Sequence, residues 1–350
     1  MPENAKPDCR DEQGERQRLL TRFRAFRQVD DMPPRGDLRA EDIWRREYSA
    51  HTEIKVAYDG EVDERIPAYL LIPRIDKQPP FPAVLAIHQC ACQCDIGKEQ
   101  VVGKCIDWPD QAYGLELVRQ GFVVLAPDAN KIGERYDPAL RKPWQTAHDE
   151  EEKRRCCTAP GGPWGPIRWK SSYDVMRGID FLCQHDLVDE SRIGVIGHSL
   201  GADTIIWTMP LDERIRAAAI SGGGLVAPEP GFTPYGMPYS NVLKLIAPRP
   251  FLEVTGVHDY GNCGDATCLD VAERMCKKRA AHEAARNAYV AAGAPSALAC
   301  FEHDGAHCFP EQGRQEAYAW LKRWLIAETE QEDGSNKSVD HYGSSAADRG

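Results

Sequence analysis

Hydrophobic residues alternate along this chain between two patterns. Continuous apolar runs at 83–89 and 122–129 are typical of β-strands that are buried on both faces of a sheet. Segments with helical spacing separate the strands, for example 112–121, which ends at Gly121, and 171–187. Strands that alternate with helices in this way predict the α/β class, with a mostly parallel central sheet and helices on both faces.

The remaining elements extend the same pattern. Apolar residues at i, i+4 and i+7 predict an amphipathic helix over 11–28, and its short length and basic outer face favour a packing element over a membrane anchor. Two runs at 52–58 and 65–74 are typical of an antiparallel hairpin at an edge of the sheet. Further strands are predicted at 192–197, 216–224, 249–256 and 297–304, and further helices at 202–211, 268–292 and 315–328.

This organisation predicts one α/β domain over residues 51–327, with an N-terminal helical extension at 1–50. From about residue 328 the chain lacks the apolar residues that a packed core requires. Residues 328–350 are therefore predicted to form a disordered tail.

One long segment, 131–169, departs from the alternating pattern. It is charged, rich in Pro and Gly and without clear periodicity, which is typical of a lid or a binding loop. Trp144, Trp164 and Trp169 lie within it. Two interpretations stay open: these tryptophans contribute to a substrate pocket, or they pack the loop itself.

Composition narrows the classes of function. The formal net charge of −11 argues against a general nucleic-acid-binding protein, whose affinity depends on Lys and Arg that neutralise phosphates. The N-terminus lacks the apolar core of a secretory signal peptide, and no apolar run approaches the ~18 residues that span a bilayer. We therefore expect a cytoplasmic protein without membrane association, whose 13 cysteines are mostly reduced and form no disulfide framework.

Residues that carry chemistry gather where the predicted strands end, the edge at which proteins of this class bind ligands. In "VIGHSLGA", Ser199 lies in a Gly-x-Ser-x-Gly motif between the strand at 192–197 and the helix at 202–211. A tight strand-to-helix turn needs glycine on both sides, and it exposes the serine hydroxyl at the end of the sheet. The motif predicts a nucleophilic serine, against the alternative of an ordinary turn with a capping serine.

A serine nucleophile needs a base, and the base needs a carboxylate that orients it. After a motif of this kind, the acid and then the histidine follow the serine along the chain. Asp259 comes just after the strand at 249–256, and His307 follows the strand at 297–304. Ser199, Asp259 and His307 thus form a candidate catalytic triad in the required order.

Other residues compete for these roles. His258 lies where the acid belongs, and His303 falls inside the strand pattern, so the preferred base is His307. Asp304 is a second candidate acid, but it lies only three residues before that base. His198, beside the serine, is predicted to point away along the turn and to be structural.

Acyl transfer also needs backbone donors for the negatively charged oxygen of the intermediate. The N–H of Leu200, the residue after the serine, is one candidate. The second donor is expected in the loop after the strand at 83–89, where the N–H of Gln89, or else that of Cys90, is the candidate.

The same loop contains Cys90, Cys92 and Cys94, which raises the question of a metal site. The Cys-x-Cys-x-Cys spacing lacks the paired Cys-x-x-Cys knuckles of typical zinc sites. We therefore expect free thiols, and neither a metal nor a cofactor. Four other cysteines are candidates to complete a metal site, if one forms: Cys156, Cys157, Cys263 and Cys268.

Together these segments resemble the α/β-hydrolase superfamily, in particular its dienelactone-hydrolase and acetyl-xylan-esterase-like branch. The resemblance rests on "PAVLAIHQ", "GFVVLAPDA", "RIGVIGHSLGA", "LEVTGVHD" and "DGAHCF", which are spread over residues 82–310. It implies the α/β-hydrolase fold, the triad Ser199, Asp259 and His307, and the hydrolysis of carboxylic esters.

Two departures from the family pattern bear on the substrate. His88 and Gln89 stand where His-Gly is usual, and Ser199 occupies the position of the nucleophilic cysteine of dienelactone hydrolases. We expect a serine hydrolase that cleaves a small-molecule ester through an acyl-enzyme. The alternatives are an amidase, a peptidase or a C–C bond hydrolase or lyase on the same triad, and a catalytically silent binding protein of the same fold.

Overall fold

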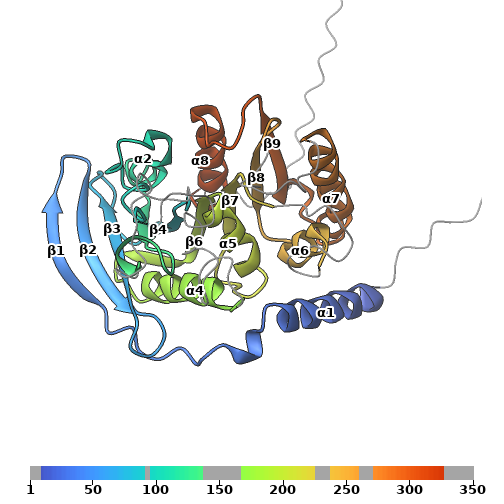
Figure 1. Cartoon of the computed structure of the whole chain (residues 1–350), viewed down its shortest axis with the longest axis horizontal. Helices are drawn as coiled ribbons and strands as arrows, with labels where there is room; N and C mark the ends of the chain where they lie inside the picture. Colours follow the sequence, from blue (N-terminus) through green and yellow to red (C-terminus); the bar gives the residue numbers. More distant parts are fainter. Residues whose placement is uncertain (1–8, 91–94, 137–166, 225–236, 260–270, 327–350) are drawn as a thin grey trace, which may run out of the picture.

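The computed structural model describes residues 9–90, 95–136, 167–224, 237–259 and 271–326. Within these ranges, nine strands form one sheet in the order β1-β2-β3-β5-β4-β6-β7-β8-β9 (Figure 1). The strands are β1 (Glu41–Glu47), β2 (His51–Asp59), β3 (Arg65–Pro73), β4 (Phe81–Ile87), β5 (Val123–Pro127), β6 (Val188–His198), β7 (Ala217–Ser221), β8 (Phe251–Gly256) and β9 (Leu298–His303). The helices are α1 (Cys9–Phe26), α2 (Tyr113–Val118), α4 (Lys170–Cys183), α5 (Leu200–Thr208), α6 (Tyr239–Ile246), α7 (Val271–Ala291) and α8 (Glu311–Leu325). Short 3₁₀ turns lie at Val29–Asp31, Pro109–Gln111, Gly133–Arg135 and Pro295–Ala297.

The sheet is mostly parallel, as predicted. Neighbouring strands among β4 to β9 are parallel, whereas β1, β2 and β3 are antiparallel to one another and β3 is antiparallel to β5. The parallel strands all end at one edge of the sheet. The loops that follow β4, β6, β8 and β9, which contain the candidate site residues, are therefore brought together there.

The predicted hairpin forms as β2 and β3, but the prediction that it lies at the edge of the sheet is wrong. Strand β1 pairs with β2 on its outer side, and nearly all its residues are exposed. Its sequence, "EDIWRRE", has too few apolar residues to give a hydrophobic pattern, which is why it escapes prediction. Charged side chains of this kind protect an edge strand from pairing with other chains.

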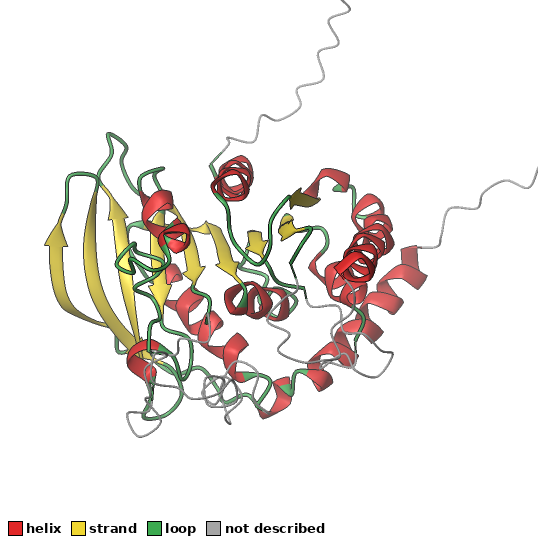
Figure 2. Cartoon of the chain, turned by 45° about the horizontal axis from the view of Figure 1, so that its top comes forward, coloured by secondary structure: helices red, strands yellow, loops and turns green. Residues whose placement is uncertain are grey.

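Helices cover both faces of the sheet. Buried residues of α4, α5, α6 and α7 share one core with one face of the sheet, and Phe23 of α1 joins them. Buried residues of α2 and α8 share a second core with the other face. Figures 1 and 2 show the sheet lying between these two groups of helices. The predicted α/β architecture is therefore confirmed.

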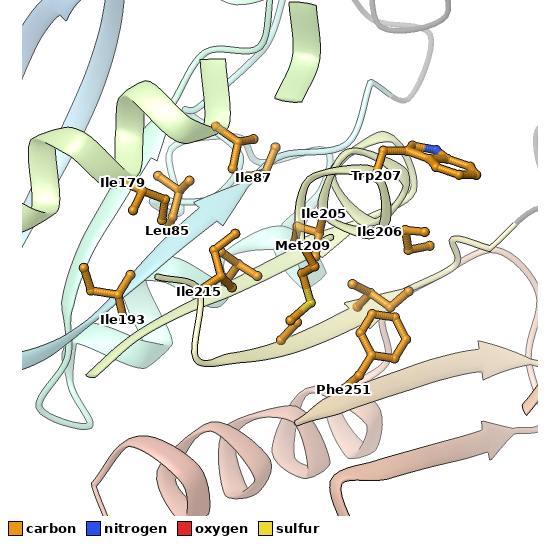
Figure 3. Packing of buried hydrophobic residues seen from close by; sticks show 14 of the residues in the cluster. Leu85, Ile87, Ile179, Ile193, Ile205, Ile206, Trp207, Met209, Ile215 and Phe251 are labelled. Carbon is orange, nitrogen blue, oxygen red and sulfur yellow. The ribbon is translucent and has the colours of Figure 1, made fainter. Parts of the chain in front are cut away.

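The core beneath α5 fixes the position of that helix. Ile205 and Ile206 are fully buried and pack in a cluster with Ile179 of α4 and Leu85 of β4 (Figure 3). A side chain of this size contributes roughly 1.5–3 kcal/mol when it is fully buried. Because this packing holds α5 firmly against the sheet, the turn from β6 into α5 also has a fixed position.

Other predicted elements form with shifted limits. Strand β6 begins at Val188, before the predicted start at residue 192, because charged and polar residues at its beginning interrupt the apolar pattern. Helix α2 ends at Val118, short of the predicted stop at Gly121. Helix α6 and strand β1 have no counterpart among the predicted elements.

Some predictions concern residues outside the described part of the chain. They are most of the insertion 131–169, the tail 328–350, Trp144 and Trp164. The limits of the predicted extension and of the predicted domain stay predictions. The two do contact each other, because Nη2 of Arg16 in α1 donates to the carbonyl oxygen of Leu245 in α6 at 2.9 Å. None of the described helices is long and apolar enough to cross a membrane.

Candidate active site

The turn between β6 and α5 has the backbone geometry of a nucleophile elbow. Ser199 has φ 54° and ψ −114°, a conformation that residues other than glycine rarely adopt and that costs about 1–3 kcal/mol. The turn also lacks space, since a Cβ at Gly201 would lie 2.2 Å from the carbonyl oxygen of Ile87. A strained serine in a turn this crowded is typical of a residue that is held for function.

Asp259 and His307 meet at the same edge of the sheet. Nδ1 of His307 lies 3.0 and 3.1 Å from the two carboxylate oxygens of Asp259. A carboxylate accepts hydrogen bonds, so Nδ1 carries the proton and donates it. Nε2 of His307 is then unprotonated, and it is buried without a hydrogen-bond partner among the described residues. An imidazole in this tautomer can accept a proton at Nε2.

The turn after β7 brings the serine and the histidine close together. The N–H of Ser199 donates to the carbonyl oxygen of Ser221 at 2.8 Å. The next residue, Gly222, lies against the histidine ring, because a Cβ there would be 2.9 Å from Cε1 of His307. Gly222 also has φ 63°, a conformation that favours glycine. Sequence reasoning missed Gly222, which appeared only as part of a glycine run at the end of a strand.

His198 is oriented differently from its prediction. Its ring does not point away from the site, because its centroid lies 4.8 Å from that of His307. Nδ1 of His198 lies 3.1 Å from Oγ of Ser221. Burial, together with the nearby His307, lowers the pKa of His198 to about 3. His198 therefore packs beside His307 as a neutral ring.

The competing residues take other positions. His258 pairs with Asp304 at 2.9 Å, and both side chains are largely exposed. His303 is buried at the end of β9, as its place in the strand pattern predicted. Burial lowers the pKa of His303.

The two candidate loops for the oxyanion donors lie side by side. Leu200 is the first residue of α5, so its N–H lies beyond the hydrogen bonds of the helix. The end of β4 packs against this helix start, through the contact between Ile87 and Gly201. Gln89 follows β4 and is 4% exposed, and Cys90 shares a small buried cluster with Leu200. These positions are compatible with the predicted oxyanion hole, which stays a prediction.

A buried network of charged side chains contacts the turn after β7. Nζ of Lys278, on α7, donates to the carbonyl oxygen of Gly223 at 2.7 Å and to Glu253 of β8 at 2.5 Å. Tyr239 and His282 also contact the Glu253 carboxylate, at 2.8 and 2.7 Å. Burial alone would raise the pKa of Glu253, but Lys278 and His282 outweigh it and lower the pKa to about 2. The only sequence signal was a lone glutamate inside the apolar strand "FLEVTG".

Asp203 is a second acidic group near the site. It lies one helical turn after Ser199, and its Oδ1 accepts the N–H of Gly224 at 3.1 Å. Burial raises the pKa of Asp203 to about 6, although Gly224 and Lys278 oppose the shift. The hydrogen bond links α5 to the loop after Gly222.

The cysteine cluster is described only in part. Cys90 is buried, whereas Cys92, Cys94 and the four cysteines considered as further metal ligands lie outside the described residues. Where the chain is described, no three His, Cys, Asp or Glu side chains gather in a way that could hold a metal ion.

Trp169 is the one predicted substrate-binding residue within the described ranges. It is buried immediately before α4, with its ring edge-on to Tyr173 at a centroid distance of 5.8 Å. The ring thus packs against α4, and a role in substrate binding stays a prediction.

Comparisons with known proteins find the same fold. The model of the Abhydrolase family matches residues 55–220, a range that includes the elbow at Ser199. The chain has the α/β-hydrolase fold, and the family model resembles it over this range. A relative in Bacillus subtilis, "Putative hydrolase YtaP", is 26% identical over 325 residues, which cover 88% of the chain and 100% of the relative.

Solved structures share the fold of this chain. Methylesterase BT1017 has a TM-score of 0.62 at 15% identity, over 91% of the chain and 65% of that protein. A "putative acetyl xylan esterase" from Bacteroides fragilis has a TM-score of 0.60 at 17% identity, over 87% and 82%. At these identities the likeness establishes the fold. The predicted resemblance to the esterase-like branch of the superfamily is confirmed at the level of the fold.

Proposed function

We propose that this α/β-hydrolase cleaves a carboxylic ester with Ser199 as nucleophile, His307 as base and Asp259 as the acid that orients the base. The observation that carries the proposal is the strained φ of Ser199 beside a histidine whose Nδ1 is bound by a buried aspartate. Neither the strained serine nor the His–Asp pair identifies an active site by itself. Their meeting at the carboxyl edge of one sheet is the arrangement that acyl transfer requires.

The proposed reaction has two steps. Oγ of Ser199 attacks the ester carbonyl while Nε2 of His307 takes its proton, and the same nitrogen then protonates the leaving alcohol. In the second step His307 takes a proton from water, which attacks the acyl-serine, and the proton returns to Oγ as the carboxylic acid leaves. Asp259 stabilises the imidazolium in both steps. The N–H of Leu200 and a donor after β4, at Gln89 or Cys90, hold the oxyanion.

An ester is the preferred substrate class because of the proteins that share this fold. Their names describe a methylesterase and an acetyl xylan esterase. An acetyl group is a short acyl chain, so we expect activity on short acyl chains. The alcohol part is not specified by any described residue.

Replacement of Ser199 by alanine tests the proposal. We expect Ser199→Ala to lose at least about 10³-fold in kcat on p-nitrophenyl acetate, because triad members act as a unit. It should also lose labelling by a fluorophosphonate. The matched control is Ser191→Ala, near the other end of β6, where the hydroxyl binds Asp189 on the exposed surface. Unchanged turnover in Ser199→Ala would contradict the proposal.

Turnover of different classes of substrate separates the proposed esterase from the alternative activities. A series of p-nitrophenyl esters of increasing acyl length should show turnover that falls with length, whereas the matching anilides and a diketone should react much more slowly. Faster cleavage of the anilide would identify an amidase or peptidase. A wild-type chain that neither turns over any substrate nor reacts with the fluorophosphonate would be a silent binding protein.

A further inference from the structure

Two buried side chains hold the carbonyl group of Gln89. Nδ1 of His88 lies 2.7 Å from this oxygen, and Nε2 of Gln100 lies 3.3 Å from it. Nε2 of Gln100 also donates to the carbonyl oxygen of Ile96 at 3.1 Å. Because both acceptors are carbonyl oxygens, the nitrogen of the Gln100 amide must face them. Neither His88 nor Gln100 is exposed.

The second ring nitrogen of His88 fixes its tautomer. Nε2 lies 3.0 Å from the backbone nitrogen of Ala129, whose N–H it accepts. A ring nitrogen that accepts a hydrogen bond carries no proton, so the proton is on Nδ1, which donates to Gln89. Burial lowers the pKa of His88 and keeps the ring neutral. His88 therefore connects the loop after β4 to the loop after β5.

We propose that His88 and Gln100 are positioning residues for the second oxyanion donor, and that this donor is the N–H of Cys90 rather than that of Gln89. The inference rests on the proposed function. A trans peptide is planar, so its C=O and N–H point in opposite directions. With the Gln89 carbonyl turned toward His88 and Gln100, the Cys90 N–H on the same peptide is turned to the opposite side.

The surroundings of Cys90 support this assignment. Cys90, Leu200 and Ile132 form one small buried cluster, so the Gln89–Cys90 peptide lies close to the residue that supplies the first donor. The contact of Ile87 with Gly201 holds the end of β4 against the start of α5. The N–H of Gln89 belongs to the preceding peptide, whose orientation the two side chains do not fix.

Variants of the two positioning residues test the proposal. Gln100→Met keeps the length of the side chain without the donor, and His88→Leu removes the ring donor. We expect each to lower kcat on p-nitrophenyl acetate about 10- to 100-fold, with KM within about twofold of wild type. The reason is that a displaced donor weakens the binding of the transition state but not that of the substrate. The pH profile of kcat/KM should keep its midpoint, since His307 is untouched.

A conservative variant and a matched control test whether the loss of activity comes from the lost donor. In His88→Asn the amide nitrogen can occupy the place of Nδ1, so it should recover most of the loss in His88→Leu. Gln111→Met is the matched control, because Gln111 is an equally buried glutamine that bonds to Asp110 instead. Cys90→Pro, which lacks the N–H, should lose about 10²–10³-fold in kcat.

Fluorophosphonate labelling separates this inference from the proposed function. If wild type and Gln100→Met both bind one equivalent, the latter more slowly, Ser199 is intact and only the donor has moved. If wild type is not labelled, the proposed function fails. If wild type is labelled but Gln100→Met and His88→Leu turn over at its rate, the inference is overturned. Cys90→Pro that folds, by its melting curve, and keeps wild-type kcat would overturn the choice of Cys90.

Discussion

Single backbone positions decide the geometry of the candidate site. Ser199 is strained, and Gly222 has a positive φ and lies in contact with the His307 ring. The motif predicted the first of these residues, because glycine on both sides of a serine after an apolar strand has a defined meaning. It did not predict the second, because only the folded chain brings Gly222 against a histidine that lies far along the sequence.

Gly222→Ala should damage the site through both strain and contact. The added Cβ would lie 2.9 Å from His307 and 3.0 Å from His198, so the catalytic ring must shift, and we expect kcat to fall about 100-fold. Gly293→Ala is the matched control, since Gly293 has φ 72° but a Cβ there would meet nothing within 4 Å among the described residues. Steady-state kinetics on p-nitrophenyl acetate compare the two. Equal activity in both variants would contradict the proposed contact.

Asp203 gives a prediction about stability and pH. Its pKa in the folded protein, about 6, lies above the usual value for an aspartate, so ionisation costs stability as the pH rises through about 4 to 6. Asp203→Asn keeps an acceptor for the Gly224 N–H without the charge. We expect it to be as stable as wild type below pH 4 and more stable by about 1–3 kcal/mol above pH 6. Urea unfolding at both pH values measures the difference, and a gain that does not grow with pH would argue against a buried charge.

Whole elements hold these residues in place through buried polar contacts as well as apolar packing. Lys278 of α7 reaches β8 and the loop after β7 at once, and its charge is almost fully buried with that of Glu253. The sequence identified α7 and β8 as elements but not this connection. A helix pattern shows which residues share a face, and it does not show which strand that face covers.

Lys278→Met should therefore destabilise the protein far more than the same change at its neighbour. Removal of one partner leaves Glu253 buried without its cation, at a cost of about 3–5 kcal/mol. The control is Lys277→Met, since Lys277 pairs with Glu273 at the surface and should change the melting temperature little. Thermal unfolding compares the two variants. Similar melting temperatures would contradict a supporting role for the buried pair.

At the scale of the molecule, α1 completes one of the two cores. Phe23 is fully buried and stacks on Trp207 of α5 at a centroid distance of 6.1 Å. The sequence predicted the helix and its apolar face, but it placed the helix in an extension before the domain. The structure shows that the face of α1 packs on the same helix that begins with the candidate nucleophile turn.

Phe23→Ala tests whether α1 is an integral part of the fold. Truncation of a fully buried phenylalanine should cost about 3–5 kcal/mol in unfolding free energy. Phe26→Ala should cost less, because Phe26 is only partly buried. Denaturant titration gives both values. A cost below about 1 kcal/mol for Phe23→Ala, on the scale of ordinary surface substitutions, would mean that α1 is dispensable.

The sequence by itself determined most of the elements and the candidate residues, because both depend on local information. Apolar runs of strand length, glycines around Ser199, and an acid and a histidine after later strands are all visible along the chain. Only the tertiary structure decided the rest: β1 outside the hairpin, the ring of His198 against His307, and the two side chains on the Gln89 carbonyl. These depend on which distant segments share a surface, and a pattern of hydrophobicity carries no record of that pairing.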